Sequence, residues 1–197
     1  RVAQAHMSLF REKKWFVSSE GSKLEQLIVE NGGRIMATAV GDDGIFQRRS
    51  FENHAQGGYE FLLSLDLPAQ AERCAAEAEA LLSAPVCPSG PRTVILGSSI
   101  LALQVHESCG HPVELDRALG SEASYAGTSF MTVDQLGLLQ YGSPVVNITA
   151  DATLPGGLGT FGWDDEGTPA EAFPVIREGR FVNYLTSRET AWWLAHN

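Results

Sequence analysis

The chain is organised around the stretch His106-Glu107-Ser108-Cys109-Gly110-His111, which continues as Pro112-Val113-Glu114-Leu115-Asp116. Two histidines flank a glutamate at short spacing. Zinc hydrolases use this set of groups, because neutral imidazoles hold the ion and a neighbouring carboxylate takes a proton from water. The same carboxylate can then hand that proton to a departing amine. The stretch is a candidate zinc site, although such histidines also occur as packed or surface residues or at helix C-termini.

The spacing of the two histidines constrains the backbone between them. They stand five residues apart, and an undistorted α-helix, turning by about 100° per residue, would separate them by roughly 140°. Gly110 weakens a helix, and Pro112 disfavours the helical conformation at His111 and lacks an amide proton. We therefore predict a π-type bulge or an abrupt helix end at Gly110, which swings His111 back toward His106. Cys109 is interpreted as a small buried residue instead of a third ligand.

The flanking residues indicate how this stretch is held. A β-branched strand is predicted at 93–96, followed by a buried helix, apolar on most sides, that delivers His106 and Glu107. Zinc-bound histidines usually donate their other ring proton to a carboxylate or carbonyl group. Glu114 and Asp116 are close enough in sequence to accept it, although both also fit ordinary surface acids.

The remaining chain predicts an antiparallel meander followed by a helix. Strands are expected at 16–22, 27–29, 35–40 and 45–51, with a break at Asn31-Gly32-Gly33, and an amphipathic helix at 69–84. Further on, we expect a small-residue loop at 121–130, a strand at 144–150 and a hairpin turning at Glu178-Gly179. Asp164-Asp165-Glu166 is either a turn with caps or part of a substrate cleft. Because these acids would repel a pyrophosphate, the preceding Gly-x-Gly-x-x-Gly pattern is not interpreted as a dinucleotide site.

Three blocks together resemble the TldD/PmbA family of zinc metallopeptidases. They are the His106–Asp116 stretch, Tyr125-Ala126-Gly127-Thr128-Ser129, and Phe161-Gly162-Trp163-Asp164-Asp165-Glu166-Gly167. Their order and separation also fit, and the likeness runs along most of the chain. The resemblance implies a zinc-dependent peptidase acting on unfolded or flexible peptides, with His106 and His111 as metal ligands and Glu107 as the residue that activates water.

The resemblance also implies what lies outside this chain. The family's third protein ligand is a cysteine beyond residue 197, so this part alone is expected to bind metal weakly and to be inactive. The family works as a pair of related subunits, of which this chain would be the catalytic kind, or as a homodimer. Two alternatives stay open: a non-catalytic interaction subunit with structural histidines, and a regulator of DNA gyrase.

Composition bounds the partners and the compartment. The formal net charge is −10, which argues against direct binding to nucleic acid or to an anionic membrane, and no apolar stretch is long enough to span a bilayer. The three cysteines form no Cys-x-x-Cys pair and predict reduced thiols in the cytoplasm. Both ends look cut, so we expect an internal fragment.

These observations predict an α+β fold. We expect an antiparallel sheet with packed helices, and the motif helix at the junction with a second β-rich part. The expected division is 1–91, the end of an α/β N-terminal domain, and 92–197, the start of the metallopeptidase domain.

Overall fold

The computed structural model describes residues 2–196, which form two compact units. Unit 1 contains the residues up to Gly90 together with Ala152–Ala170, and unit 2 contains Pro91–Asp151 and the residues from Glu171 onward. Within the described residues each unit holds an antiparallel three-stranded sheet with helices, which confirms the α+β prediction. The two units are compact regions, and compactness alone does not define a domain. The predicted domain boundary between residues 91 and 92 therefore stays a prediction.

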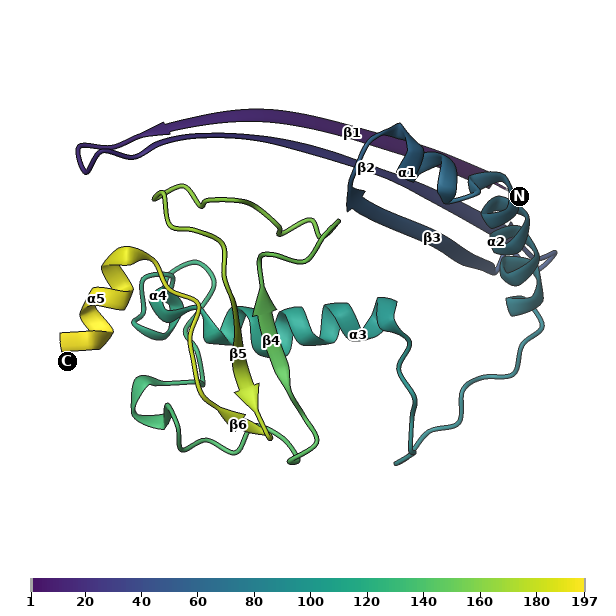
Figure 1. The fold of residues 1–197 in the computed structure, drawn as a ribbon. Helices are drawn as coiled ribbons and strands as arrows, with labels where there is room; N and C mark the ends of the chain where they lie inside the picture. Colours follow the sequence, from purple (N-terminus) through teal and green to yellow (C-terminus); the bar gives the residue numbers. More distant parts are fainter. Residues whose placement is uncertain (1, 197) are drawn as a thin grey trace. The chain divides into compact units, whose positions relative to one another are not determined.

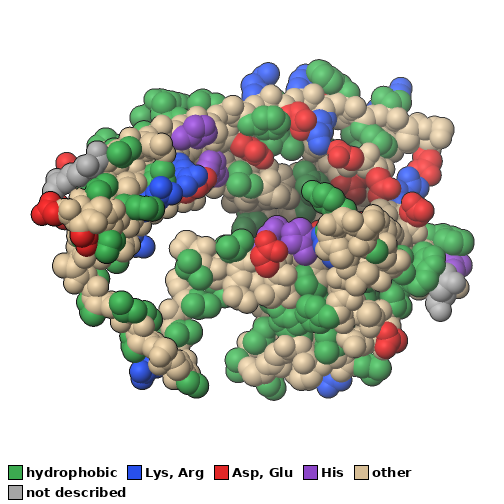
Figure 2. All heavy atoms as spheres, turned by 180° about the vertical axis from the view of Figure 1, so that it is seen from behind, with side chains coloured by type: hydrophobic (Ala, Val, Ile, Leu, Met, Phe, Trp, Pro, Cys, Tyr) green, Lys and Arg blue, Asp and Glu red, His purple; other side chains and the backbone are tan. Residues whose placement is uncertain are grey.

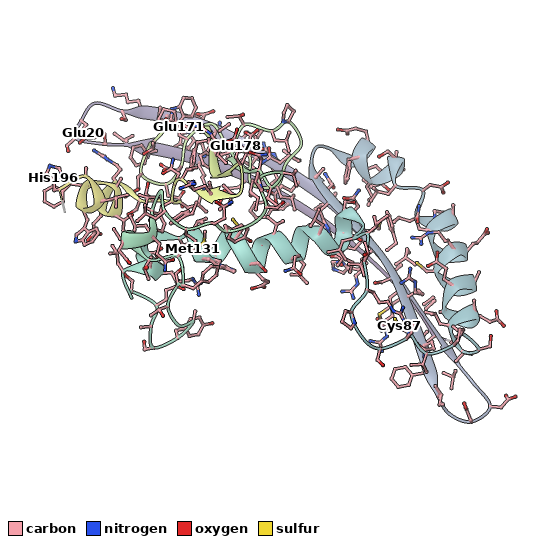
Figure 3. The ribbon with its side chains drawn as sticks, turned by 90° about the horizontal axis from the view of Figure 1, so that it is seen from below. Glu20, Cys87, Met131, Glu171, Glu178 and His196 are labelled. Atoms are coloured by element: carbon pink, nitrogen blue, oxygen red, sulfur yellow. The ribbon has the colours of Figure 1, made fainter. Side chains whose placement is uncertain are left out.

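The sheet of unit 1 is an antiparallel meander, as predicted. Strands β1 (Val2–Val17), β2 (Lys23–Val40) and β3 (Phe46–Gln56) pair in that order, with Val17 opposite Lys23 and Val2 opposite Thr38. Figure 1 shows β1 and β2 as one long curved hairpin with β3 beside β2. Glu20 lies in the turn at the end of this hairpin (Figure 3), where Gly21 adopts φ +94°.

The predicted break at Asn31-Gly32-Gly33 is wrong, because β2 runs through it without interruption. The glycines are needed for close packing instead of a turn. A Cβ atom at Gly32 would overlap the His54 ring, and one at Gly33 would meet the Leu62 and Leu67 side chains at 3.0 and 2.9 Å. Tertiary packing thus explains a residue pattern that is locally typical of a turn.

Two helices, α1 (Tyr59–Ser64) and α2 (Leu67–Leu81), follow the sheet. The Asp66 side chain caps α2 by accepting a hydrogen bond from the Ala69 amide at 3.3 Å. Cys74 and Ala78 are fully buried on the apolar side of α2, and Cys74 packs with Ile35 of β2. The predicted helix at 69–84 is confirmed, although it ends three residues earlier, at Leu81.

The segment Ala152–Ala170, which connects β4 to β5 in the sequence, belongs to unit 1. Gln26 of β2 binds it with both ends of its amide: Nε2 donates to the Trp163 carbonyl at 2.9 Å and Oε1 accepts from the Gly162 amide at 3.1 Å. Asp164 accepts from the Glu166 and Thr168 amides at 2.9 and 2.8 Å. The acidic triplet is therefore a side-chain-stabilised turn, one of the two predicted alternatives.

Unit 2 corrects two predictions. The strand predicted at 93–96 is wrong: residues 91–97 form no regular structure, no described strand pairs with them, and Ile95 is 99% exposed. The predicted helix forms as α3 (Ser98–Val105), but the prediction that it is buried is wrong: Ile100 and Leu103 are each 61% exposed. The apolar residues of α3 indicated that the helix would be buried, but the residues at 2–196 do not pack over them. Across these residues no helix combines the length and apolar character needed to cross a membrane.

The sheet of unit 2 consists of β4 (Ile148–Asp151), β5 (Ala172–Arg177) and β6 (Arg180–Phe181). β4 starts four residues later than the predicted strand at 144–150. The hairpin turns at Glu178-Gly179 as predicted, with φ of 50° and 75°. A Cβ atom on Gly179 would collide with the Gly142 and Ser143 carbonyl oxygens, so this position requires glycine. Short helices η3 (Val133–Gln135) and α5 (Arg188–His196) complete the unit.

The core of unit 2 surrounds Tyr184, which is only 1% exposed. Its hydroxyl donates to the Met131 carbonyl, and Figure 3 marks Met131 in this unit. Burial raises the pKa of Tyr184 to about 12, with a smaller contribution from Asp134. The buried residues of this core are Cys109, Val113, Leu115, Met131, Val175, Ile176, Phe181 and Tyr184.

We expect the stability of unit 2 to fall above pH 10 because of Tyr184. Its pKa is about 10 in the unfolded chain and about 12 when folded, so the stabilisation is complete below pH 10 and is lost as pH rises through 12. Two pKa units correspond to about 2–3 kcal/mol. Urea unfolding at pH 8 and 11.5 should show this loss in the wild type and a smaller loss in Tyr184→Phe. Tyr125→Phe, at a 95% exposed position, is the matched control, and equal losses in all three proteins would contradict the assignment.

Candidate metal centre

Helix α3 continues directly into a π-helical turn, η1 (His106–Gly110). The turn is closed by the His111 amide, which donates to the His106 carbonyl five residues earlier. His111 then starts a 3₁₀ turn, η2 (His111–Val113), with Pro112 at its beginning. This confirms the predicted π-type bulge. The wider turn absorbs the extra residue, and the two imidazole ring centroids lie 4.4 Å apart.

The turn also brings Glu107 to the two imidazoles. The metal-binding atoms offered by His106, Glu107 and His111 all lie within 4.8 Å of one another. Two ligands of a tetrahedral zinc ion lie roughly 3.4 Å apart at ordinary bond lengths. The side chains of His106 and Glu107 are 57% and 62% exposed, so they have room to close the remaining gap. Figure 2 shows histidine side chains at the surface beside acidic ones. Imidazole nitrogens with a carboxylate oxygen fit zinc.

Cys109 lies within the same turn but belongs to the core. It is fully buried among the apolar residues of unit 2, and this burial raises the pKa of its thiol. A protonated, inward-facing thiol is a poor ligand for an ion at the surface. The prediction that Cys109 is a small buried residue is confirmed. Its side chain fastens the turn to the core while the histidines face outward.

Two contacts that the sequence did not indicate hold the turn in place. The Tyr141 hydroxyl donates to the Ser108 carbonyl at 3.1 Å, and burial raises the pKa of Tyr141. After the turn, the backbone at Val113 and Leu115 pairs with Leu185. The Leu185 amide donates to the Val113 carbonyl at 2.7 Å, and the Leu185 carbonyl accepts from the Leu115 amide at 3.0 Å. The backbone on both sides of Glu114 is therefore fixed.

Glu114 lies beside one imidazole, and Asp116 does not. His111 Nδ1 lies 3.1 Å from Glu114 Oε1, and an ionised carboxylate can only accept, so this contact favours the tautomer with the proton on Nδ1. Asp116 is exposed, and its charge acts on Arg117; among residues 2–196 its carboxylate contacts neither imidazole. The structure thus places one of the two candidate supporting acids next to the site.

Arg117 in helix α4 (Leu115–Ala118) is a residue that the sequence analysis missed. Its Nε donates to Glu114 Oε2 at 3.0 Å, and this hydrogen bond raises the already high pKa of the guanidinium. The spacing was a usable signal, because residues three apart meet on a helical turn. Arg117 therefore stays charged and paired with the acid that contacts His111.

Unit 1 carries a separate cavity of about 260 Å³. It is lined by β1 and β2 near the hairpin turn and by the segment at 163–165, and it includes Trp15, Phe16 and Trp163. Lys14 pairs with Asp165 at 2.9 Å at its edge. The acidic triplet thus contributes to a cavity as well as forming a turn.

Two imidazoles and a carboxylate gathered by a π turn on an α+β scaffold define a candidate metal-ion site of the hydrolase type. The sequence profile described as the PmbA/TldA metallopeptidase C-terminal domain matches residues 89–196, which include all three groups. The chain therefore belongs to the TldD/PmbA metallopeptidase family, as its sequence motifs indicated.

A sequence relative supports this assignment, and two solved structures share the fold. A Synechocystis protein named a metalloprotease is 34% identical over 174 residues, which are 88% of this chain and 35% of that protein. A solved structure from Thermotoga maritima, named as a candidate modulator of a DNA gyrase, has a TM-score of 0.69 at 22% identity and covers 91% of this chain and 38% of its own. TldE from Thermococcus kodakarensis has a TM-score of 0.58 at 17% identity, covering 88% and 36%. The chain thus spans little more than a third of each.

Proposed function

We propose that this chain carries the catalytic centre of a zinc-dependent metallopeptidase, in which His106 and His111 hold the ion and Glu107 activates water. The observation that carries the proposal is the π turn, which gathers the three side chains within 4.8 Å of one another. Membership of a metallopeptidase family supports it independently. With two histidines from this chain, a third protein ligand is expected outside the described residues.

The chemistry follows from the groups that the turn presents. A bound zinc ion would lower the pKa of a water molecule and polarise the substrate carbonyl. The water oxygen forms a bond with the carbonyl carbon while Glu107 accepts a proton from that water. Glu107 then returns a proton to the amide nitrogen as the C–N bond breaks. The products are one carboxylate and one amine. Glu114 Oε1, 3.1 Å from His111 Nδ1, orients the His111 ring.

The substrate and the assembly are part of the same proposal. We expect unfolded or flexible peptides as substrates, because an extended backbone must lie across the centre to present a peptide bond to it. A homologous partner subunit or a second copy is the expected assembly, supported by the likeness to TldE. The cytoplasm is the expected compartment, supported by the free thiols of Cys74, Cys87 and Cys109.

The direct test is metal-dependent cleavage of an unfolded polypeptide by the protein at the full length of its relatives. We expect cleavage to stop in excess chelator and to return when zinc is added back. The same polypeptide in its folded state is the control, and it should resist cleavage. Cleavage that continues unchanged in chelator would contradict the metal-dependent mechanism.

A further inference from the structure

Arg117 makes three contacts in unit 2 through one guanidinium group. Its Nε donates to Glu114 Oε2 at 3.0 Å, one Nη pairs with Glu122 Oε2 at 2.7 Å, and the other donates to the Ala126 carbonyl at 3.0 Å. Its side chain is only 13% exposed. Such a fork of fixed donors is characteristic of Arg and is not available to Lys. The contacts therefore tie the end of the metal turn to the loop at 119–128.

The Glu114 carboxylate is divided between two partners. One oxygen faces His111 Nδ1 at 3.1 Å and the other faces Arg117 Nε at 3.0 Å. With both oxygens occupied, the carboxylate cannot rotate away from the imidazole without breaking a charged hydrogen bond. Arg117 Nη2 itself lies 3.5 Å from His111 Nδ1, farther than the carboxylate. Arg117 thus acts on the histidine through Glu114.

The charges around Arg117 explain why a cation is needed there. Glu114 and Glu122 both contact its guanidinium, and Asp116 adds a third negative charge nearby. Without the arginine, Glu114 and Glu122 would repel each other, since like charges at short range in a partly buried site are screened weakly. The loop that bears Glu122 would then separate from the residues that follow the metal turn.

We propose that Arg117 is a positioning residue: through Glu114 it fixes the tautomer and orientation of His111, and through Glu122 and Ala126 it holds the loop at 119–128 beside the metal turn. The significance for catalysis rests on the proposed function, but the positioning itself belongs to the metal-free protein. It makes His111 a preorganised ligand, with its ring held in one orientation before an ion arrives.

The test compares Arg117→Gln and Arg117→Lys with Arg180→Gln. Arg180 is a suitable control because it is an exposed arginine of unit 2 that likewise donates to a backbone carbonyl, that of Gly137. In metal-free protein, we expect Arg117→Gln to accelerate exchange of the Tyr125 and Ala126 amides and to shift the ¹⁵N signals of His111 toward a mixture of tautomers. Arg117→Lys should recover part of both effects, because it restores the charge but not the fork.

Metal affinity supplies the second readout. With zinc competed against a chelator of known affinity, Arg117→Gln should bind about 10- to 100-fold more weakly than wild type. Combined with Glu114→Gln, its effect should be much smaller than in the wild-type background, because the two residues act through one contact. Equal effects in both backgrounds would overturn the route through Glu114.

The two proposals fail in distinguishable ways. If Arg117→Gln leaves amide exchange in the loop and the His111 tautomer unchanged, the positioning role is overturned whatever the metal does. If both change but the wild-type protein at the full length of its relatives binds no zinc, the positioning role stands and the metallopeptidase proposal falls.

Discussion

In the protein at the full length of its relatives, we expect Glu107→Gln to reduce the rate of peptide cleavage by about 10²- to 10⁴-fold while leaving zinc content and folding unchanged. Glutamine has nearly the same shape but cannot accept the proton of the attacking water. The Glu107 side chain is 62% exposed and packs in no core, so its replacement should not disturb the π turn. The measurements are kcat on an unfolded peptide, zinc per chain, and circular dichroism.

A matched control separates the loss of the base from a general change of charge. Glu171 is exposed in the same unit, and Glu171→Gln should retain full activity. Unchanged cleavage by Glu107→Gln would contradict the mechanism. No cleavage by the wild-type protein itself would instead favour a non-catalytic interaction subunit, or a regulator of DNA gyrase, in which the histidines are structural. Loss of zinc together with activity would indicate that Glu107 is a ligand instead of the base.

The second large effect is expected from His111→Ala. This change removes one of the two imidazoles at the candidate centre. Zinc affinity should therefore fall by more than about 100-fold, which is more than the loss expected for a residue that only supports a ligand. Activity should disappear with it. The measurement is zinc affinity by competition with a chelator, with thermal unfolding to establish that the chain still folds.

His6→Ala is the matched control for this change. His6 is an exposed histidine of β1 in unit 1, so its removal subtracts one imidazole without altering the candidate centre. We expect wild-type zinc affinity in this variant. Equal loss from both variants would show that zinc binds histidines non-specifically, and no loss from either would show that the histidines are not ligands.

The geometry of the centre was predictable because its cause is local. On a regular α-helix the five-residue interval would place the His106 and His111 imidazoles on different sides, and Gly110 and Pro112 disfavour such a helix; the structure brings the imidazoles together by a π turn. The position of Glu114 three residues after His111 was predictable for the same reason.

What the sequence left unpredicted depends on contacts between distant residues. Glycines at 32 and 33 are typical of a turn, and only the packing of His54, Leu62 and Leu67 against them reveals a continuous strand. The placement of Ala152–Ala170 in unit 1 depends on Gln26, whose amide fits the backbone at Gly162 and Trp163. Such a contact leaves no periodic pattern of hydrophobic residues in the sequence. The exposure of α3 was likewise invisible, since hydrophobicity indicates a need for cover and not its source.

The central claim is that His106 and His111 are zinc ligands completed by a group outside residues 2–196. The most direct test is zinc per chain by elemental analysis at neutral pH, for this chain and for the protein at the full length of its relatives. The account predicts about one zinc per chain in the longer form only, removed by His111→Ala. Absence of metal from both forms would contradict it and leave the histidines with a structural role.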